Sequence, residues 1–553
     1  MIRKTAAVLA ALGLSATVAA AQPPQSGDRA ERAGRAAVPR ANAQRPDEPG
    51  APGAMVERRT ERGAQAGEHK ISDADIATAP VLEQAKSSHH TVTINGQTIG
   101  YTATAGTLTL RSDDGKPIAS MFYVAYTADG GKNRPVTFSY NGGPGSASLF
   151  VHMGLAGPMH VNTDSPNATH GPPFNITENP YSLLDKSDMV FLDAIGAGYS
   201  RPLGDTKGTE FWGVDQDIDA FTRGIQRYIT INHRWNSPKF IFGESYGTTR
   251  SAGLSLALQQ HGIQLNGVLL LSSVLNYGAH DSGFDHSFIS YVPSYAATAV
   301  YWKKSATQPK DLNAYLDEVR AWAQGPYLAA LTKGSKISPA EFDATAKQLS
   351  AYIGIPVEFI KRANLRVDLN HFRAELLRDQ GRILGRYDTR FTGINTDNAV
   401  ANAEYDPSDT GINGAYVAAL HDWVEQLGYT TDLNYWPSGP NINQSWDWRH
   451  RPPGGFGGGG RRENVANTAA DLGMAMRENP HLMVYSLNGI YDMATPFFGT
   501  EYDIEHLYLD PSIRGNVRFG YYPSGHMVYL NQDAMKQMKA DVAKFYDDAL
   551  AKR

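Results

Sequence analysis

The amino-acid sequence predicts an α/β fold with a mostly parallel central sheet and an inserted, mainly helical cap. Short apolar runs alternate with helical patterns, which is typical of strands that are buried on both faces of a parallel sheet. A long, mainly helical stretch then interrupts this alternation, and the strand pattern returns near the end of the chain. These observations indicate one α/β domain that is built from two separate stretches of sequence.

The first part of the predicted core covers residues 90–275. It opens with β-branched and aromatic residues that alternate with polar ones. Asn95-Gly96 and Asp114-Gly115 break this alternation, which predicts antiparallel hairpins. The apolar runs "RPVTFSY", "SDMVFLDAIG", "KFIFGES" and "LNGVLLLSSVL" follow, and we expect them to be the strands of the parallel sheet.

The predicted cap covers residues 276–470, and the second part of the core covers residues 471–553. Helical patterns such as "DLNAYLDEVRAWAQGPYLAAL" and "SPAEFDATAKQLSAYIG" fill much of the cap. The strand pattern returns with "HLMVYSLNGIYD" and "NVRFGYYPSGH", and a helix is expected to close the chain.

The N-terminus has the pattern of an export signal. Residues 1–21 have a basic start, a short apolar stretch and small residues up to Ala21, which predicts a signal peptide that is cleaved near Ala21. We expect residues 22–75, rich in Ala, Pro, Gly, Arg and Glu, to form a disordered leader. No other segment has the length and apolarity of a membrane-spanning helix, so the protein is expected in the periplasm or the medium.

The composition and charge exclude several kinds of functional site and make one class of binding partner unexpected. Of the 553 residues 41% are hydrophobic and 19% are charged, and the formal charge is −5, so nucleic acid is not an expected partner. The chain has no cysteine, which excludes disulfides, thiolate metal sites and a cysteine nucleophile. We expect neither a metal nor an organic cofactor, and the sequence gives no indication of an oligomeric state.

Gly243-Glu244-Ser245-Tyr246-Gly247 fits the G-x-S-x-G pattern of a serine nucleophile. A sharp turn brings the strand and the following helix too close for side chains beside the serine, which explains the two glycines. The other interpretation is an ordinary turn of small residues. The apolar strand before the motif and the helical pattern after it favour the nucleophile.

Two later residues complete a triad in the chain order of α/β-hydrolases, serine then acid then histidine. Asp492 ends a late strand pattern, and His526 follows a Pro-Ser-Gly turn. Either residue alone is more often structural, but both occur in the required order. Asp193 is a competing acid that precedes Ser245, and we interpret it as a structural residue near the pocket.

The run Asn141-Gly142-Gly143-Pro144-Gly145 is expected to supply a further backbone donor to an oxyanion. It ends an apolar strand, and its amides are not obstructed by side chains. A phosphate-binding loop is the alternative, but the lysine that such a loop requires does not follow.

On these residues the chain resembles the serine carboxypeptidase family, peptidase family S10. The similar segments occur in order as "NGGPGSAS", "NPYSLLDKSDMVFLDAIGAGYS", "GESYGTTR", "NGIYDMATP" and "SGHMVYL". The resemblance runs from about residue 115 to the C-terminus, and the helical middle is similar only in outline to the family's variable cap. The segments "GRYDTRFTG" and "YDPSD" look like the bacterial branch.

The resemblance implies the α/β-hydrolase fold and the removal of single residues from the C-terminus of a peptide substrate. It implies that Ser245 is the nucleophile, that His526 is the general base and acid, and that Asp492 is the orienting acid. The oxyanion-hole amides would be those of Gly143 and Tyr246.

The resemblance also implies a site for the carboxylate of the substrate. Asn141, Gly142 and Glu244 would hold that carboxylate, with Glu244 protonated so that it donates a hydrogen bond. Family members have a second glutamate that pairs with this one, and Leu155 occupies its place here. Glu244 therefore lacks a like-charge neighbour that would raise its pKa.

The sequence leaves three functions to compare. The first is an exported serine carboxypeptidase. The second keeps the triad in an esterase, an acyltransferase or another peptidase, because function lies in the pocket rather than in the fold. The third is a binding protein without catalysis, which the intact serine, aspartate and histidine disfavour.

Overall fold

The computed structural model describes residues 81–131, 133–280, 283–453 and 462–552. The expected signal peptide and leader, residues 1–21 and 22–75, lie outside the described residues. In the described part of the chain, no helix has both the length and the apolarity needed to cross a membrane.

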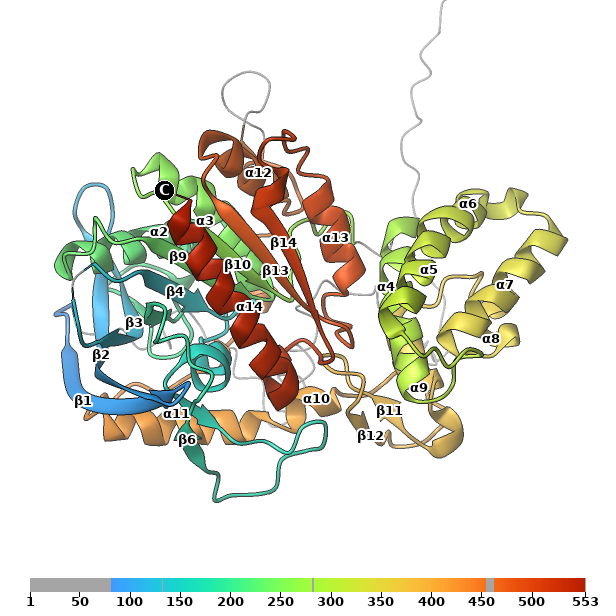
Figure 1. Cartoon of the computed structure of the whole chain (residues 1–553), viewed down its shortest axis with the longest axis horizontal. Coiled ribbons are helices and arrows are strands. Elements are labelled where there is room, and N and C mark those ends of the chain that lie inside the picture. Colours follow the sequence, from blue (N-terminus) through green and yellow to red (C-terminus); the bar gives the residue numbers. More distant parts are fainter. Residues whose placement is uncertain (1–80, 132, 281–282, 454–461, 553) are drawn as a thin grey trace, which may run out of the picture. The chain divides into compact units, whose positions relative to one another are not determined.

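Within the described residues a ten-stranded sheet has the order β1-β2-β3-β7-β4-β9-β10-β13-β14, with β8 paired to β3 (Figure 1). Pairs along β1, β2, β3 and β7 are antiparallel, and every pair from β7 to β14 is parallel. The strands are β1 Ala85–Ile94, β2 Gln97–Arg111, β3 Pro117–Ala128, β4 Val136–Tyr140, β7 Asp188–Leu192, β8 Arg201–Pro202, β9 Lys239–Glu244, β10 Gly267–Leu271, β13 Met483–Gly489 and β14 Val517–Tyr522.

In the part of the chain that the structure describes, two short hairpins lie outside this sheet. They pair β5 Met159–Val161 with β6 Ile176–Glu178, and β11 Ile383–Leu384 with β12 Thr392–Gly393.

The first hairpin shows how local sequence fixes the antiparallel end of the sheet. Ile94 pairs with Gln97, so the turn consists of Asn95 and Gly96 alone. Both turn residues have positive φ, 51° and 75°, which is the conformation that an Asn-Gly hairpin turn requires. The predicted hairpin is therefore confirmed.

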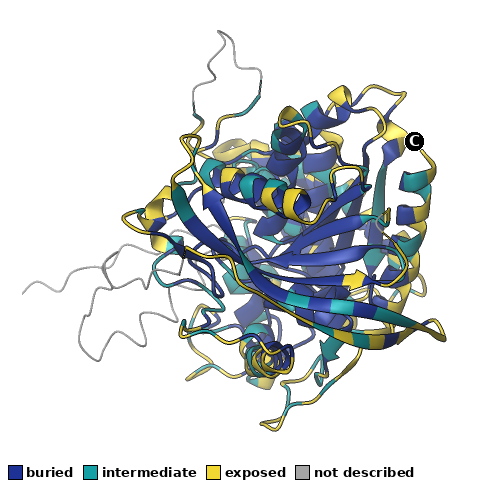
Figure 2. Cartoon of the chain, turned by 90° about the vertical axis from the view of Figure 1, so that its left-hand side faces the viewer, coloured by how far each residue is buried: buried dark blue, intermediate teal, exposed yellow. Residues whose placement is uncertain are grey.

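The inner strands are apolar on both faces because helices cover both sides of the sheet. In β9, Phe240 and Phe242 belong to one apolar cluster and Ile241 to another, as the alternation of side chains in a strand requires. Figure 2 shows these strands buried along their length, whereas the outer hairpin is partly exposed.

The helices divide between the two faces. Helices α11 and α14 contribute to the first cluster, and α2, α3 and α12 contribute to the second. The bounds are α2 Val214–Ile231, α3 Tyr246–Gln260, α11 Asn413–Gln426, α12 Ala469–Glu478, α13 Phe497–Glu505 and α14 Gln532–Ala551. The predicted mostly parallel sheet, covered by helices, is confirmed, and the order of strands and helices is that of an α/β-hydrolase.

The helical insertion has an apolar cluster of its own, which also includes residues just after β13 and in α13. Figure 1 shows its helices beyond α13 and β14. They are α4 Asp285–Tyr301, α5 Leu312–Trp322, α6 Leu328–Thr332, α7 Pro339–Ile353, α8 Val357–Arg362 and α9 Leu369–Glu375, followed by the short α10 Pro407–Thr410. Helix α11 also lies within residues 276–470, but it packs with the sheet; the proposed domain bounds stay a prediction.

Candidate active site

The residues that the sequence analysis selected follow four of the five adjacent parallel strands β4, β9, β10, β13 and β14. The glycine loop follows β4, Ser245 follows β9, Asp492 follows β13 and His526 follows β14. Parallel strands place their carboxyl ends at one edge of a sheet, which is where such folds bind ligands. The topology therefore brings the selected residues to a common edge.

Ser245 has a strained backbone on a sharp turn. Its φ and ψ are 61° and −132°, in a region that residues other than glycine seldom occupy. A Cβ on Gly243 would lie 2.1 Å from the carbonyl oxygen of Gly247, so a side chain there would collide with the turn. Ser245 begins helix α3, yet its hydroxyl makes no capping hydrogen bond. It is partly exposed, whereas Glu244 and Tyr246 on either side of it are buried.

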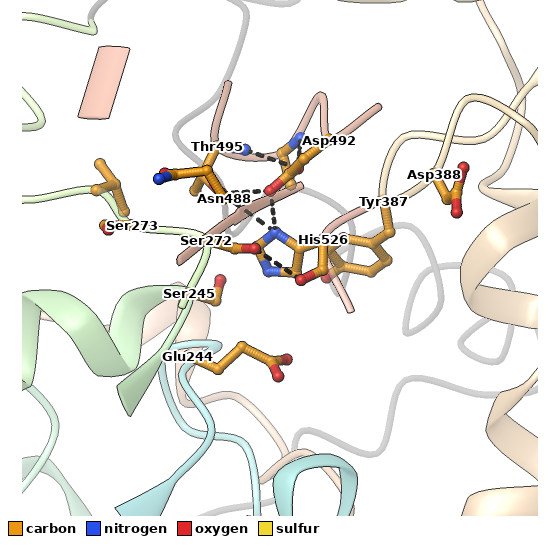
Figure 3. A network of polar contacts seen from close by, with 12 residues as sticks. Glu244, Ser245, Ser272, Ser273, Tyr387, Asp388, Asn488, Asp492, Thr495 and His526 are labelled. Carbon is orange, nitrogen blue, oxygen red and sulfur yellow. Dashed lines mark hydrogen bonds and ion pairs between the residues drawn. The ribbon is translucent and has the colours of Figure 1, made fainter. Parts of the chain in front are cut away.

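Asp492 and His526 form a buried pair (Figure 3). The Oδ2 atom of Asp492 lies 2.7 Å from Nδ1 of His526. The amides of Ala494 and Thr495 donate to Oδ1, and the Thr495 hydroxyl donates to Oδ2. The carboxylate is thereby fixed, and as an acceptor it keeps the proton of His526 on Nδ1, which leaves Nε2 as the acceptor of the ring.

Ser245 and His526 are anchored to consecutive residues at the end of β10. The Ser245 amide donates to the Leu271 carbonyl at 3.0 Å, and the Ser272 hydroxyl donates to the His526 carbonyl at 2.7 Å. In Figure 3 Ser245 lies on the side of the imidazole opposite to Asp492. The described residues contain no Ser245–His526 hydrogen bond, and this contact is often long before substrate binds.

The glycine loop contacts the turn that carries Ser245. A Cβ on Gly142 would lie 2.4 Å from the Tyr246 nitrogen and 2.8 Å from the Glu244 carbonyl oxygen. Gly143 has a φ of +108°, which favours glycine. Among the described residues neither the Gly143 amide nor the Tyr246 amide has a hydrogen-bond acceptor. Two unused donors therefore lie near Ser245, one of them at the N-terminus of α3.

Glu244 is enclosed beside the serine. Its side chain accepts a hydrogen bond from Nδ2 of Asn141 at 3.0 Å, and its second oxygen has no partner in ordinary hydrogen-bond geometry within the described residues. The Asn141 oxygen accepts from the amides of Phe150 and Val151, which fixes the orientation of its amide. Burial raises the pKa of Glu244 to about 7, although the nearby His526 opposes the rise.

Tyrosines surround Glu244, and the sequence analysis did not find them. Leu155 is buried in a short helical turn, Val151–Ala156. A Cβ on the neighbouring Gly154 would lie 2.4 Å from the Tyr416 hydroxyl and 2.5 Å from the Tyr529 ring. The phenols of both tyrosines interact electrostatically with Glu244. Only Tyr529 has a sequence signal, since it follows His526 by three residues.

Within the described residues Asp193 makes no hydrogen bond to Asp492 or His526. Its Oδ1 accepts from the Ser148 amide at 2.7 Å, and Gly198 packs directly against its carboxyl group. Burial raises the pKa of Asp193 to about 7. These contacts fit the structural role that we expected for it. The described residues contain no group of three His, Cys, Asp or Glu side chains suited to a metal ion.

Comparison with known sequences relates part of the chain to one family. Residues 94–284 match the sequence model described as serine carboxypeptidase. "Serine carboxypeptidase-like 45" of Arabidopsis thaliana is 27% identical over 188 residues, 32% of this chain and 38% of that protein. "Serine carboxypeptidase ctsa-3.2" of Caenorhabditis elegans is 33% identical over 119 residues, 20% of each chain. The chain thus covers less than two thirds of the length of these relatives.

Solved structures of similar fold share little sequence with this chain. A proline iminopeptidase of Mycobacterium smegmatis is 15% identical with a TM-score of 0.35, covering 81% of this chain and 100% of that one. A monoglyceride lipase of Saccharomyces cerevisiae is 10% identical with a TM-score of 0.35, covering 80% and 94%. The strand order of the sheet, and not these TM-scores, defines the fold of this chain.

Proposed function

We propose that this chain is a serine carboxypeptidase that hydrolyses the C-terminal bond of peptides through an acyl-enzyme. The observation that carries the proposal is the buried Asp492–His526 pair at the same sheet edge as the strained turn of Ser245. The match of residues 94–284 to the serine carboxypeptidase family supports the choice of substrate.

In this mechanism Nε2 of His526 accepts the Ser245 proton while the serine oxygen attacks the scissile carbonyl carbon. The amides of Gly143 and Tyr246 donate to the oxyanion that forms. His526 then gives its proton to the leaving amine, which departs as the free terminal amino acid. Water, deprotonated by His526, hydrolyses the ester on Ser245, and Asp492 stabilises the imidazolium throughout.

Recognition of the terminal carboxylate is assigned to Asn141, Gly142 and Glu244. One Nδ2 proton of Asn141 is donated to Glu244, and a substrate carboxylate would compete with the Tyr529 hydroxyl for the second. The Gly142 backbone lies against the Ser245 turn, so a carboxylate held there would be close to the scissile bond. Protonated Glu244 would donate a hydrogen bond to the carboxylate, whereas ionised Glu244 would repel it.

A second candidate is an esterase, an acyltransferase or another peptidase that uses the same triad. The observation in its favour is that Leu155, a buried apolar residue, stands where the resemblance expects a second glutamate. In that case recognition would not depend on a free carboxylate in the substrate.

We also propose that the protein is exported and belongs to the bacterial branch of the family. The pattern of residues 1–21 supports export to the periplasm or the medium, and the segments "GRYDTRFTG" and "YDPSD" support the branch. N-terminal sequencing of the mature protein from the growth medium and from the periplasmic fraction would test cleavage near Ala21.

The first test compares an N-blocked dipeptide as free acid and as C-terminal amide, from pH 4 to pH 9. We expect a strong preference for the free acid, and a loss of about 10⁴- to 10⁶-fold in kcat for Ser245→Ala. Equal rates on both substrates would favour the second candidate. An organophosphonate that fails to label the wild-type protein on Ser245 would instead support a binding protein without catalysis.

A further inference from the structure

A five-residue segment of the insertion, Arg386–Arg390, contacts His526 and the residues on both sides of Asp492. It forms most of the loop of the hairpin between β11 and β12. We call this segment the strap. It lies far from Asp492 and His526 in sequence, yet its contacts converge on the two turns that carry them.

The strap holds His526 by its backbone and by its ring. The His526 amide donates to the Tyr387 carbonyl at 2.6 Å. The Tyr387 ring stacks on the imidazole, with centroids 4.9 Å apart and planes at 28° (Figure 3). The Tyr387 ring therefore restricts movement of the imidazole on one face. Asp492 fixes the edge of the imidazole that carries Nδ1.

An ion pair within the strap holds the turn before His526. Arg390 and Asp388 are both buried, with Nη2 and Oδ2 2.6 Å apart. The same guanidinium donates to the Pro523 carbonyl at 2.9 Å and to the Ser524 hydroxyl at 3.2 Å. The residues from Pro523 to His526 follow β14 without regular secondary structure, so these bonds replace the support that a helix or strand would give.

Both ends of the strap bond to the turn that carries Asp492. The Met493 amide donates to the Arg386 carbonyl at 3.0 Å, and the Thr389 amide donates to the Tyr491 carbonyl at 3.2 Å. The residues on both sides of Asp492 are thus bonded to the segment that also holds His526.

The strap itself is anchored at the start of α10. The two carboxylate oxygens of Asp406 accept from the amides of Arg386 and Tyr387, at 2.8 and 3.2 Å. The Ser408 hydroxyl accepts from the Asp388 amide at 3.1 Å. These residues belong to the segments "GRYDTRFTG" and "YDPSD", to which the proposed chemistry had given no role.

We propose that the strap positions His526 and Asp492 for catalysis, and that Tyr387 and Arg390 are its main positioning residues. This proposal rests on the proposed function of the triad. Proton transfer by His526 needs its Nε2 aimed at Ser245, and a displacement of about 1 Å can lower a rate by about 100-fold. A site is held this closely only when the residues behind it are themselves fixed by packing and hydrogen bonds.

The alternative is that the strap merely joins the insertion to the sheet domain. A second ion pair can serve as a control for this alternative. Arg320 of α5 pairs with Glu501 of α13 at 2.8 Å, and this pair also joins the insertion to the sheet domain. Glu501 also accepts from the Tyr521 hydroxyl in β14 at 2.7 Å, but in the described structure neither Arg320 nor Glu501 bonds the turns that carry Asp492 and His526. A role in joining alone predicts that loss of either ion pair has the same effect on activity.

The experiment compares three variants of the full-length protein. The first replaces the strap ion pair by Asp388→Asn with Arg390→Gln, so that no buried charge is left unpaired. The second is Tyr387→Leu, which removes the stacked, half-buried ring. The control replaces the matched pair by Arg320→Gln with Glu501→Gln. Each is measured for kcat and KM on the N-blocked dipeptide acid, for active sites by organophosphonate titration, and for Tm.

We expect both strap variants to lose about 10- to 100-fold in kcat per titrated active site, with KM changed less than about twofold. We expect the control to keep its kcat per active site even if its Tm falls. Unchanged kcat per active site in both strap variants, or an equal loss in the control, would overturn the proposal. A wild-type protein that neither cleaves the dipeptide nor reacts with the phosphonate would refute the proposed function instead.

Discussion

At the scale of single residues, Glu244 is an acidic side chain of the candidate site whose pKa is raised by its surroundings. It is next to Ser245, 3% exposed, and bonded to Asn141, and its pKa is raised to about 7 by burial. Leu155 stands where the resemblance expects a second glutamate, and burial is the largest cause of the raised pKa of Glu244, with a smaller contribution from the charge of Asp492. The proposed carboxylate recognition should therefore work only while Glu244 keeps its proton.

We expect the ratio of kcat/KM for the free-acid dipeptide to that for the amide to fall as the pH rises through about 7. Both substrates use the same triad, so its titration cancels from the ratio. In Glu244→Gln the ratio should stay level from pH 5 to pH 9, because an amide donates a hydrogen bond at every pH.

Asp193→Asn is the control for that measurement, since burial also raises the pKa of Asp193 to about 7. The ratio in this variant should fall with pH as it does in the wild type. A wild-type ratio that is level across the range would contradict the role assigned to Glu244.

At the scale of elements, a buried ion pair joins α2 to α3, the helix that Ser245 begins. Arg250 of α3 and Asp217 of α2 are 0% and 4% exposed, and their charged atoms lie 2.7 Å apart. Arg250 also donates to the Asn141 carbonyl at 2.8 Å, so it connects α3 to the start of the glycine loop. Burial raises the pKa of Asp217 despite Arg250, which shows that desolvation of the pair is costly.

Removal of one partner should therefore be far worse than removal of both. We expect Asp217→Ala to lower the free energy of unfolding by about 3–5 kcal/mol, because it leaves the Arg250 charge buried and unpaired. Asp217→Ala with Arg250→Met should recover most of that loss. Urea denaturation measures the free energy of unfolding of the single and the double variant.

Asp219→Ala supplies the comparison on the same helix. Asp219 is 51% exposed and pairs with Arg223, so its loss should cost about 0–1 kcal/mol. If Asp217→Ala and Asp219→Ala lowered the free energy of unfolding equally, the buried α2–α3 ion pair would contribute no more to stability than the exposed pair.

At the scale of the whole molecule, His450 joins its own segment to α12 and to the start of α2, which is 235 positions away in sequence. Its Nδ1 lies 2.7 Å from Asp215 at the start of α2, and its Nε2 lies 2.8 Å from Asp471 in α12. Burial by itself would lower the pKa of His450, but hydrogen bonds to the two carboxylates raise it to about 9. The protonated imidazole therefore joins its own segment, near the end of residues 276–470, to α2 and α12.

Because the pKa of His450 rises from 6.5 to about 9 on folding, its contribution to stability is complete below about pH 6.5 and is lost towards pH 9. The loss in the free energy of unfolding should be on the order of 2–3 kcal/mol. In His450→Gln this decline between pH 6.5 and pH 9 should largely disappear. His170→Gln, at an exposed histidine paired with Asp164, should keep the wild-type slope.

Much of the fold could be predicted because its signals are local. The apolar runs of β4, β9 and β10 indicate strands buried on both faces, and Asn95-Gly96 specifies a two-residue turn. The turn at Ser245 has a local signal too, since a side chain at position 243, two residues before it, would collide with the Gly247 carbonyl. Chain order then placed Asp492 and His526 after late strands, as the topology shows.

What the sequence could not provide is the set of contacts between distant residues. Tyr387 and Arg390 come from the insertion, and Arg390 reaches Ser524 across 134 positions of sequence. Tyr416 approaches Glu244 from α11, which no spacing or periodicity predicts. The sequence by itself determined the candidate residues for the proposed chemistry and their order along the chain. Only the tertiary structure decided what holds those residues in place, because packing and hydrogen bonds join side chains by their distance in space.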